Sequence, residues 1–202
     1  MNAAGKMIKL PGPACDGKLA LEAAFVGRRS IRNYKEAPVE LREISQLLWA
    51  AQGINRPGGY RTCPSAGALY PLELQLVAGW IDGLLCGCYR YDCANHALLL
   101  EDEKDIRRDL ALAALGQSMI SRAPATISIS AVFDRTTRRY GERGIRYICM
   151  EAGHAAQNIH LQAVSLNLGT VVIGAFHDIE VKKALGLQPD ESPLLLMPVG
   201  KI

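Results

Sequence analysis

The sequence contains no long hydrophobic run, and this absence excludes several kinds of protein. Nowhere do about twenty apolar residues follow one another, so no transmembrane helix is expected. The first ten residues also have no apolar stretch of the length that a secretory signal peptide needs, and prolines at positions 11 and 13 follow them. We therefore expect a cytoplasmic protein that does not associate with a membrane.

An excess of charge of one sign is also missing. The chain carries 23 basic and 20 acidic residues, a net charge of +3, which is too small a surplus to indicate nucleic-acid binding. The most basic stretch, residues 135–147, contains five arginines and two tyrosines, a combination that nucleic-acid-binding proteins also use. Glu142 interrupts this stretch, which favours a solvated loop over nucleic-acid binding. Of all three interpretations, we favour a loop that lines a substrate pocket. We expect no nucleic-acid partner.

The motifs of several large enzyme classes are absent. The chain has no G-x-G-x-x-G, no G-x-x-x-x-G-K-[ST], no G-x-S-x-G and no H-E-x-x-H. A Rossmann fingerprint, a P-loop, a nucleophile elbow and a zinc-protease helix are therefore excluded. The six cysteines include no C-x-x-C pair, and the densest group, residues 86–96, alternates as a β-hairpin does. We expect free thiols and no metal site.

The apolar residues suffice for one core. The chain has 202 residues, 49% of them hydrophobic, which is typical of a single globular domain. We therefore expect one domain over residues 1–202, with residues 1–17, broken by proline and glycine, as an extended arm. The apolar content, together with 19 glycines, favours an obligate dimer, because such interfaces resemble a core cut in half.

Hydrophobic periodicity predicts the secondary structure. Helices are expected over residues 19–27, 41–51, 106–115, 144–167 and 179–185. Strands are expected over residues 72–78, 88–91, 97–101, 125–133, 170–173 and 194–199. The longest predicted helix is rich in alanine and glycine, which permits close packing, and we expect it at the centre of the molecule. Strands and helices interleave without a linker, so the predicted fold class is α+β.

A turn rich in arginine is the first of four segments whose composition suggests a binding site. Arg28, Arg29 and Arg32, with Ser30 between them, follow the end of a predicted helix at Gly27. Guanidinium groups pair bidentately with phosphate oxygens, so the turn is suited to a phosphate. A solvated charged turn is the alternative for this pattern taken alone.

The other three segments consist mainly of small or apolar residues. Residues 64–71 form a loop of small residues between two prolines, which lets the backbone approach a flat ligand. Residues 169–176 predict a strand that ends in glycine and presents a backbone N–H to a ligand. At the C-terminus Lys201 would add a second cation for an anion. Taken alone, residues 64–71 would equally suit an ordinary tight surface loop, and residues 169–176 are more typical of an ordinary core strand followed by a turn.

Together and in this order, the segments resemble the nitroreductase family, in particular its compact branch that includes the SagB-type azoline dehydrogenases. The resemblance covers nearly the whole chain, and the ordered set of motifs is highly specific. The motifs are RRSIRNY (28–34), ISQLLWAAQG (44–53), PSAGALYP (64–71), YGERG (140–144), EAGHAAQN (151–158), LGTVVIGAF (168–176) and MPVGK (197–201).

The resemblance implies a mixed, mainly antiparallel sheet flanked by helices, and a homodimer built on long central helices. It also implies two FMN sites per dimer, each lying where the subunits meet. The residues that the family's motifs assign to FMN are Arg28, Arg29 and Ser30 at the phosphate, Arg32 near the N1–O2 edge of the ring, Pro64, Ser65, Ala66 and Leu69 from the partner's loop, Ile173 and Gly174 through their backbone at the N5 edge, and Lys201 near the phosphate.

The chain departs from the family's pattern at two places. Many nitroreductases carry an asparagine where this chain has Ala68, so backbone or another side chain must contact the pyrimidine edge of the flavin. The sequence also stops at Ile202, short of the basic tail of larger relatives. The phosphate site is therefore expected to depend more heavily on the arginine turn.

The implied activity is hydride transfer from NADH or NADPH through N5 of FMN to a small acceptor such as a nitroaromatic or a quinone. The flavin carries this chemistry, and Arg32 is expected to stabilise negative charge at the N1–O2 edge. Gln117, Tyr140 and Arg146 are candidates for shaping the acceptor pocket. Two alternatives stay open: an FMN-dependent dehydrogenase of peptide azolines or another modified metabolite, and a non-enzymatic flavin-binding sensor.

Overall fold

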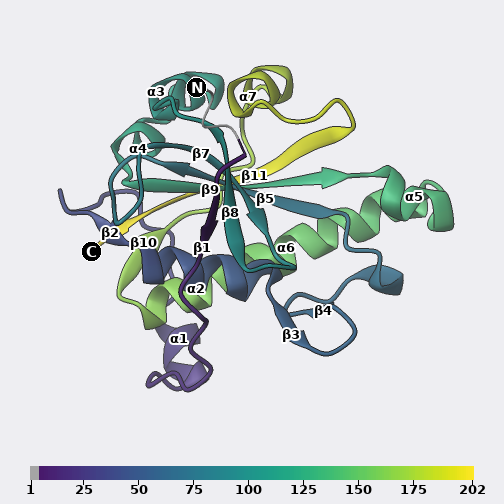
Figure 1. The fold of residues 1–202 in the computed structure, drawn as a ribbon, viewed down its shortest axis with the longest axis horizontal. Coiled ribbons are helices and arrows are strands. Elements are labelled where there is room, and N and C mark those ends of the chain that lie inside the picture. Colours follow the sequence, from purple (N-terminus) through teal and green to yellow (C-terminus); the bar gives the residue numbers. More distant parts are fainter. Residues whose placement is uncertain (1–4) are drawn as a thin grey trace.

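A seven-stranded sheet forms the centre of the computed structural model, which describes residues 5–202 (Figure 1). The strand order is β1-β8-β7-β5-β9-β11-β10, and every neighbouring pair is antiparallel. The strands are β1 (Met7–Lys9), β5 (Leu72–Ala78), β7 (Gly87–Asp92), β8 (Ala97–Asp102), β9 (Ala125–Val132), β10 (Leu168–Thr170) and β11 (Glu191–Lys201). Two small ladders lie outside this sheet: parallel β2 (Val39–Glu40) with β6 (Ile81–Asp82), and antiparallel β3 (Ile54–Arg56) with β4 (Tyr60–Arg61). The predicted α+β class with a mainly antiparallel sheet is confirmed.

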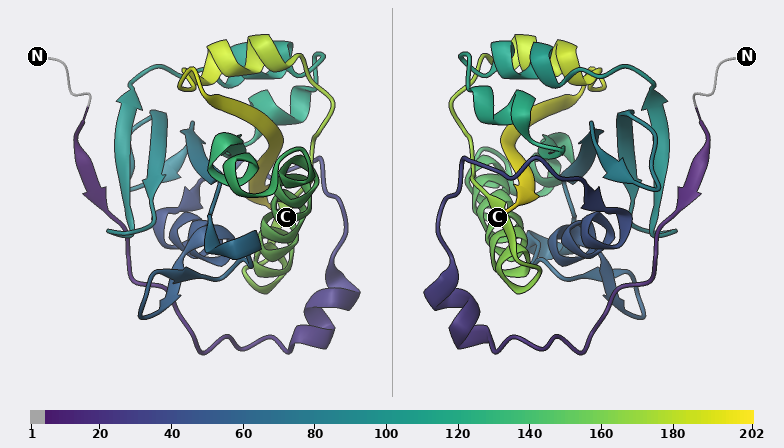
Figure 2. Two further views of the ribbon diagram at one scale, coloured as in Figure 1. Left: turned by 90° about the vertical axis from the view of Figure 1, so that its right-hand side faces the viewer. Right: turned by 90° about the vertical axis from the view of Figure 1, so that its left-hand side faces the viewer.

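Helices cover both faces of the sheet, as the two side views in Figure 2 make plain. One face packs against α2 (Leu41–Gln52) and α6 (Arg143–Ser165). The other packs against α3 (Arg107–Ala113), α4 (Ser118–Arg122) and α7 (Asp178–Leu185). The result is a three-layer arrangement with two apolar cores, one on each side of the sheet.

Strand β5 contributes side chains to both cores, because successive residues of a strand point to opposite faces of the sheet. Leu72, Leu74 and Leu76 are almost fully buried in the larger core beneath α2 and α6, whereas Val77 joins the smaller core. Successive side chains of a strand point to opposite faces, so a central strand must be apolar on both. The predicted strand over residues 72–78 coincides with β5.

Helix α6 is the longest element, with 23 residues, about 35 Å at 1.5 Å per residue. Its buried alanines, such as Ala152 and Ala155, allow it to lie close to α2 and the sheet. Its outer face is exposed and partly apolar: Ile145 is 47% exposed and Met150 54%. Helix α1 (Leu21–Gly27) packs near the C-terminal end of α6, where a Cβ on Gly27 would stand 3.0 Å from Val164.

Two predicted helix and loop boundaries differ from the structure. The helix expected over 106–115 ends at Ala113, because Leu115 and Gly116 take positive φ values of 58° and 73° that a right-handed helix cannot continue. The basic stretch expected as a loop instead forms α5 (Asp134–Tyr140) and the start of α6. An acidic residue in the first turn of α5 and arginines in its last turn complement the helix dipole, which the loop interpretation overlooked.

The strand expected over 170–173 is also shorter than predicted. Strand β10 ends at Thr170, and Ile173 then makes a single isolated bridge to Leu196 of β11. Residues 171–177 therefore run as an irregular segment along β11 and lead to α7. Irregular backbone leaves N–H groups without partners in a β-ladder, so they are free to donate to a bound ligand.

The N-terminal arm is held by side chains of α2. Strand β1 pairs with the edge of β8, and the chain then passes over α2. The Ser45 hydroxyl donates to the Pro11 carbonyl at 2.6 Å, and the Gln46 amide exchanges two hydrogen bonds with the backbone of Ala14. The first four residues of the expected arm lie outside the described residues.

The cysteine-rich segment is a hairpin, as predicted. Strands β7 and β8 are joined by a turn in which the Asp92 carboxylate accepts hydrogen bonds from the N–H groups of Ala94 and Asn95. All six cysteines are free thiols. Between residues 5 and 202 no group of three or more histidine, cysteine and acidic side chains could hold a metal ion. No helix in that range has the length and apolar character needed to cross a membrane.

Candidate functional site

Three cavities follow one another along the exposed side of α6. The first, of about 250 Å³, lies under the loop of residues 64–71 near the start of the helix. The second, of about 340 Å³, lies at its middle, and the third, of about 380 Å³, near its C-terminal end. His160 lines both the second and the third, so these two adjoin and together have the size of a site for a small cofactor.

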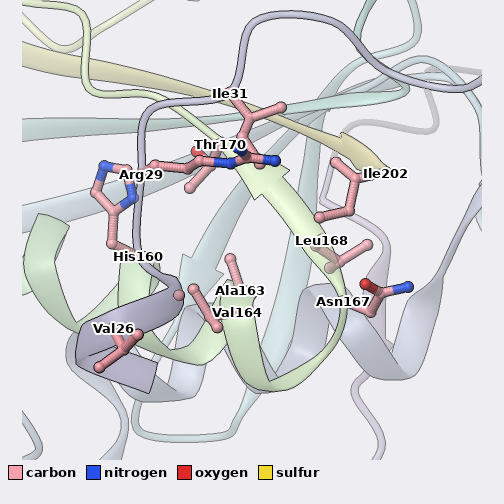
Figure 3. A pocket seen from close by; sticks show the side chains of 11 residues that line it. Val26, Arg29, Ile31, His160, Ala163, Val164, Asn167, Leu168, Thr170 and Ile202 are labelled. Atoms are coloured by element: carbon pink, nitrogen blue, oxygen red, sulfur yellow. The ribbon is translucent and has the colours of Figure 1, made fainter. Parts of the chain in front are cut away.

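The third cavity is the polar one. Figure 3 shows Arg29, His160 and Thr170 around its upper part, with Ala163 and Val164 of α6 below. No acidic side chain of residues 5–202 pairs with Arg29. The Thr170 hydroxyl is buried, and within the described chain it has no hydrogen-bond partner. An unpaired guanidinium beside an unsatisfied buried hydroxyl suits an anion with hydrogen-bonding oxygens.

Backbone contacts hold the arginine turn in this position. The Ile31 N–H donates to the Thr170 carbonyl at 2.9 Å, which ties the turn to the end of β10. A glycine in β10 is needed for this approach, because a Cβ on Gly169 would stand 2.7 Å from Ile31 and 2.6 Å from Ile202. The Arg28 N–H caps α1 by donating to Ala24. The turn is therefore fixed from both sides before any ligand binds.

His160 separates the polar cavity from the apolar one. It is 5% exposed, and burial, followed by the nearby charge of Arg28, lowers its pKa. The imidazole is therefore neutral near pH 7 and can donate or accept a hydrogen bond without adding a charge. Sequence reasoning did not select it, although a histidine within an alanine-rich helix face was visible in the sequence.

The second cavity is lined mainly by carbon. Its walls come from the small residues of α6 and from residues of β11 and the segment after β10, and they are Cys149, Ala152, Gly153, Ala156, Gln157, His160, Val172, Leu194 and Leu195. The small side chains of α6 leave room for a flat group against the helix. Such a surface suits the apolar ring system of a ligand whose charged end occupies the polar cavity.

The two backbone donors predicted in the segment after β10 differ in whether they are free. The Ile173 N–H is already used, since it donates to the Leu196 carbonyl at 2.9 Å. The next residue, Gly174, is exposed, and in residues 5–202 no acceptor is bonded to its N–H. The Gln117 side chain holds this segment by donating to the Ala175 carbonyl at 2.9 Å. Of the two backbone donors predicted here, only that of Gly174 is available.

The loop of residues 64–71 has a strained backbone. Gly67, Ala68 and Tyr70 all take positive φ, at 64°, 54° and 47°. For a non-glycine residue this costs about 1–2 kcal/mol, and such strain persists only where surrounding contacts enforce it. One contact is internal, because the Tyr70 N–H donates to Ser65 Oγ at 2.9 Å. Another comes from Arg135, whose guanidinium donates to the Tyr70 carbonyl at 3.2 Å.

A buried acid lies under this loop and was not selected from the sequence. Glu151 of α6 is 3% exposed, and one of its carboxylate oxygens has no partner among the described residues. Burial raises its pKa from 4.5 to about 7, although a hydrogen bond from Ser65 and the charge of Arg61 act in the opposite direction. The signal available in the sequence was a glutamate on the apolar stripe of the central helix, three residues after Ile148.

The predicted site residues fall into two groups at opposite ends of α6. Near its C-terminal end lies the arginine turn, whereas Gly174 lies beside the middle cavity, where a Cβ on it would stand 3.8 Å from Leu195, and Gln117 holds the adjoining Ala175. Near its start lie the 64–71 loop, Tyr140, whose hydroxyl approaches Gly67, and the exposed Arg146. Lys201 pairs with Glu43 of α2 at 2.5 Å, so its charge is already matched within the chain.

The two groups lie beside different stretches of α6. Glu151 and Ala163 line the first and the last cavity and are twelve residues apart, which is about 18 Å along a helix. Between and around them the surface is apolar: Met150, Val172 and Phe25 of α1 are 54%, 37% and 55% exposed.

Comparison with known proteins gives a consistent result. The family model described as "Nitroreductase family" matches residues 26–201. A protein of Methanocaldococcus jannaschii, provisionally named a nitroreductase, is 46% identical over 184 residues, which cover 91% of this chain and 92% of that protein. The crystal structure of a provisionally named nitroreductase from Ralstonia eutropha has a TM-score of 0.86 at 29% identity and covers 100% of this chain and 91% of its own.

A further relative has a specialised name. The microcin B17-processing protein McbC of Escherichia coli is 27% identical over 175 residues. The match covers 81% of this chain but only 63% of McbC, so the chain spans less than two thirds of that relative.

Proposed function

This chain belongs to the nitroreductase family, and from that premise we propose that it is an FMN-dependent oxidoreductase that works as a homodimer. The observation that carries the proposal is the pair of adjoining cavities that meet at His160. One has an unpaired guanidinium and an unsatisfied hydroxyl, and the other has carbon walls. This division matches a ligand with an anionic end and a flat apolar ring.

The polar cavity fits the phosphate end of FMN. The guanidinium of Arg29 would pair with phosphate oxygens, and Arg28 and Ser30 would add donors from the same turn. The Thr170 hydroxyl would gain the hydrogen bond that it lacks in the described chain, since buried polar groups without partners are costly. His160, whose lowered pKa keeps it neutral, would bond to an oxygen of the ribityl chain without adding a charge.

The apolar cavity fits the ring. The small residues Gly153 and Ala156 would face the ring plane, and the N–H of Gly174 would donate to its reactive edge. Arg32, which is exposed and has no acidic partner in residues 5–202, would lie near the N1–O2 edge. When bound, FMN supplies the redox chemistry by accepting a hydride from NADH or NADPH and passing it to a small acceptor. The protein's part is to hold, orient and shield the ring.

A second subunit would complete this site. If two copies pack their exposed α6 faces together in antiparallel fashion about a two-fold axis, the start of one helix meets the end of the other. Pro64, Ser65, Ala66 and Leu69 of one loop would then cover the ring held by the partner's arginine turn. The exposed apolar side chains Ile145 and Met150 on the outer face of α6 support this packing.

Lys201 has a conditional role in this proposal. Its ammonium pairs with Glu43, whose other carboxylate oxygen accepts from the Glu40 N–H at the start of α2. To reach the phosphate, Lys201 would have to share its donors with that carboxylate. We therefore expect the arginine turn to contribute more to FMN affinity than Lys201.

The test begins with the purified protein. Its absorption spectrum and its mass in solution should reveal a yellow dimer, or a colourless dimer that turns yellow with added FMN. A monomer that takes up no FMN would overturn the proposal. Flavin reduction would then be followed by rapid mixing with NADH and with NADPH, and reoxidation by a nitroaromatic or a quinone.

A charge-neutral variant tests the arginine turn. Arg29→Gln should weaken FMN binding by about ten- to hundredfold, because hydrogen bonds to a charged partner contribute about 1.5–3 kcal/mol. Arg42→Gln is the matched control, since Arg42 is exposed on α2 and pairs with Glu40. Equal FMN affinity in the two variants, measured by fluorescence titration, would exclude Arg29 from the site.

A second candidate function keeps the cofactor but changes the reaction. The similarity to McbC, a protein named for processing microcin B17, favours a dehydrogenase acting on azoline rings of a modified peptide. Such an enzyme would take its electrons from the peptide, so NADH and NADPH would leave the bound flavin oxidised in anaerobic mixing. Rapid reduction by either nucleotide would favour the general reductase.

A further inference from the structure

The junction of α5 and α6 carries an unusual concentration of positive charge. Five arginines stand between residues 135 and 146. Two of them are matched: Arg135 pairs with Glu73 at 2.6 Å, and Arg138 pairs with Asp134 at 3.4 Å. The remaining three, Arg139, Arg143 and Arg146, are exposed and have no acidic partner in residues 5–202.

The position of two of these arginines is electrostatically unfavourable. Arg143 and Arg146 occupy the first turn of α6, which itself contains no acidic residue; the one carboxylate at this helix end is that of Glu142 at the N-cap position. The N-terminus of a helix carries partial positive charge, so cations there are destabilising. Natural sequences break such local rules mainly at functional sites. An anion bound at this end would relieve both the side-chain repulsion and the dipole.

Two of the arginines have helix neighbours that line a cavity with an aromatic wall. Residues four apart on a helix share a face, so Arg143 is adjacent to Tyr147 and Arg146 to Met150, and both of these neighbours line the cavity of about 250 Å³. Tyr147 packs edge-to-face against Tyr140, with ring centroids 5.2 Å apart. Figure 1 places α5 and the start of α6 at the same end of the molecule.

One of these arginines, Arg139, borders the loop that would cover the partner's flavin. The terminal nitrogen of Arg139 lies 3.1 Å from the position that a Cβ on Gly67 would take, and the Tyr140 hydroxyl lies 2.8 Å from it. The guanidinium of Arg139 also stacks on the Tyr140 ring at 5.4 Å. A molecule entering beside this loop would therefore approach the Arg139 guanidinium, with Arg143 and Arg146 on the adjoining first turn of α6.

We propose that Arg139, Arg143 and Arg146 select substrates that carry an anionic group, a carboxylate or a phosphate, beside a flat aromatic or conjugated part. This inference rests on the proposed function, which it deepens by naming the substrate class. The flat part packs on Tyr147 within the cavity, and the anionic group binds the guanidinium groups at its mouth. The anion is either on the electron acceptor or is the 2′-phosphate of NADPH.

The experiment compares matched substrates. Steady-state kcat/KM is measured for 4-nitrobenzoate and for uncharged 4-nitrobenzamide, and separately for NADPH and NADH. In the wild type, kcat/KM should be at least fivefold higher for 4-nitrobenzoate than for 4-nitrobenzamide, or at least fivefold higher for NADPH than for NADH. In 0.5 M salt this ratio of kcat/KM values should be smaller. In the double variant Arg143→Gln/Arg146→Gln the ratio should fall to within twofold of one. In Arg138→Gln, the matched control on α5, it should stay at the wild-type value.

The outcome identifies the source of the anion. A preference in the acceptor pair that the double variant loses assigns the site to the acceptor, and a preference in the nucleotide pair assigns it to the 2′-phosphate. Ratios near one for both pairs in the wild type, or ratios that the double variant leaves unchanged, overturn the proposal.

A binding measurement separates this inference from the proposed function. Calorimetric titration of the purified protein with 4-nitrobenzoate and with 4-nitrobenzamide needs no turnover. Tighter binding of the carboxylate that is lost in the double variant supports the anion site even if no flavin binds and the redox proposal fails. Equal binding of the two compounds, together with equal binding of NADP⁺ and NAD⁺, in a protein whose bound FMN is reduced by NADH or NADPH refutes the anion site alone.

Discussion

Replacement of Glu151 by glutamine should change how the stability of the protein depends on pH. Glu151 is 3% exposed, and burial raises its pKa from 4.5 to about 7. The folded state therefore binds this proton more tightly than the unfolded state does. By linkage, the free energy of unfolding falls as pH rises from 4.5 through 7. Over this range the unfolded state releases the proton readily, whereas the folded state would have to ionise a buried carboxyl group to do so.

The magnitude follows from the two pKa values. A shift from 4.5 to about 7 corresponds to about 3 kcal/mol at 1.36 kcal/mol per unit. Part of this stabilisation has already been lost at pH 5, so the free energy of unfolding that Glu151 contributes falls by about 2.5 kcal/mol between pH 5 and pH 8. Glutamine has nearly the same shape and does not titrate. Relative to the variant, the wild type should therefore lose about 2.5 kcal/mol of unfolding free energy over that interval.

Urea titrations at pH 5, 6, 7 and 8, at one fixed protein concentration, measure this difference. Any constant offset caused by the amide cancels, because only the change in the difference with pH is compared. Glu180→Gln on α7 is the control, since Glu180 is exposed, and its difference from the wild type should stay flat. Parallel pH profiles for wild type and Glu151→Gln would refute the conclusion that this carboxyl is protonated in the folded protein near pH 7.

Three further substitutions test other parts of the structure. Ala68→Gly should raise the free energy of unfolding by about 1 kcal/mol, because glycine removes the cost of a positive φ of 54°; a lower thermal midpoint would contradict this. Gly169→Ala should weaken FMN binding and lower the free energy of unfolding by about 1–3 kcal/mol, since its Cβ would stand 2.7 Å from Ile31 and displace the arginine turn. Unchanged FMN affinity and an unchanged thermal midpoint would show that the turn tolerates the added methyl group. Arg90→Met should destabilise the fold by about 3–5 kcal/mol in urea titration, because it leaves the buried carboxylate of Glu191 without its partner at 2.7 Å; a loss under 1 kcal/mol would mean that this charge network contributes little.

Local patterns predicted most of the elements. Strand β5 and helices α2 and α6 each have a strong hydrophobic period that matches one side of a core, and their bounds were predicted to within about two residues. Helix α5 was missed because its residues are mostly polar, so it has no such period. Its helical state comes instead from dipole complementarity and from its contact with the 64–71 loop.

The candidate site was predicted as a list of segments and not as an arrangement. The arginine turn and the 64–71 loop were both recognised from composition and motif order. Their placement beside different stretches of α6 follows from which strands and helices pack together, which no local pattern records. The same holds for the Ile173 N–H, whose bond to Leu196 depends on the path of the chain beside β11.

The amino-acid sequence by itself determined the family, the α+β class and the chemical types gathered for a phosphate and a flat ring, because these depend on residue identity and order along the chain. The tertiary structure alone decided that Glu151 is a buried acid with a raised pKa, that Thr170 lacks a partner within residues 5–202, and that Arg139 lies against the 64–71 loop. Burial and pairing depend on neighbours distant in sequence, and only the folded chain brings these together.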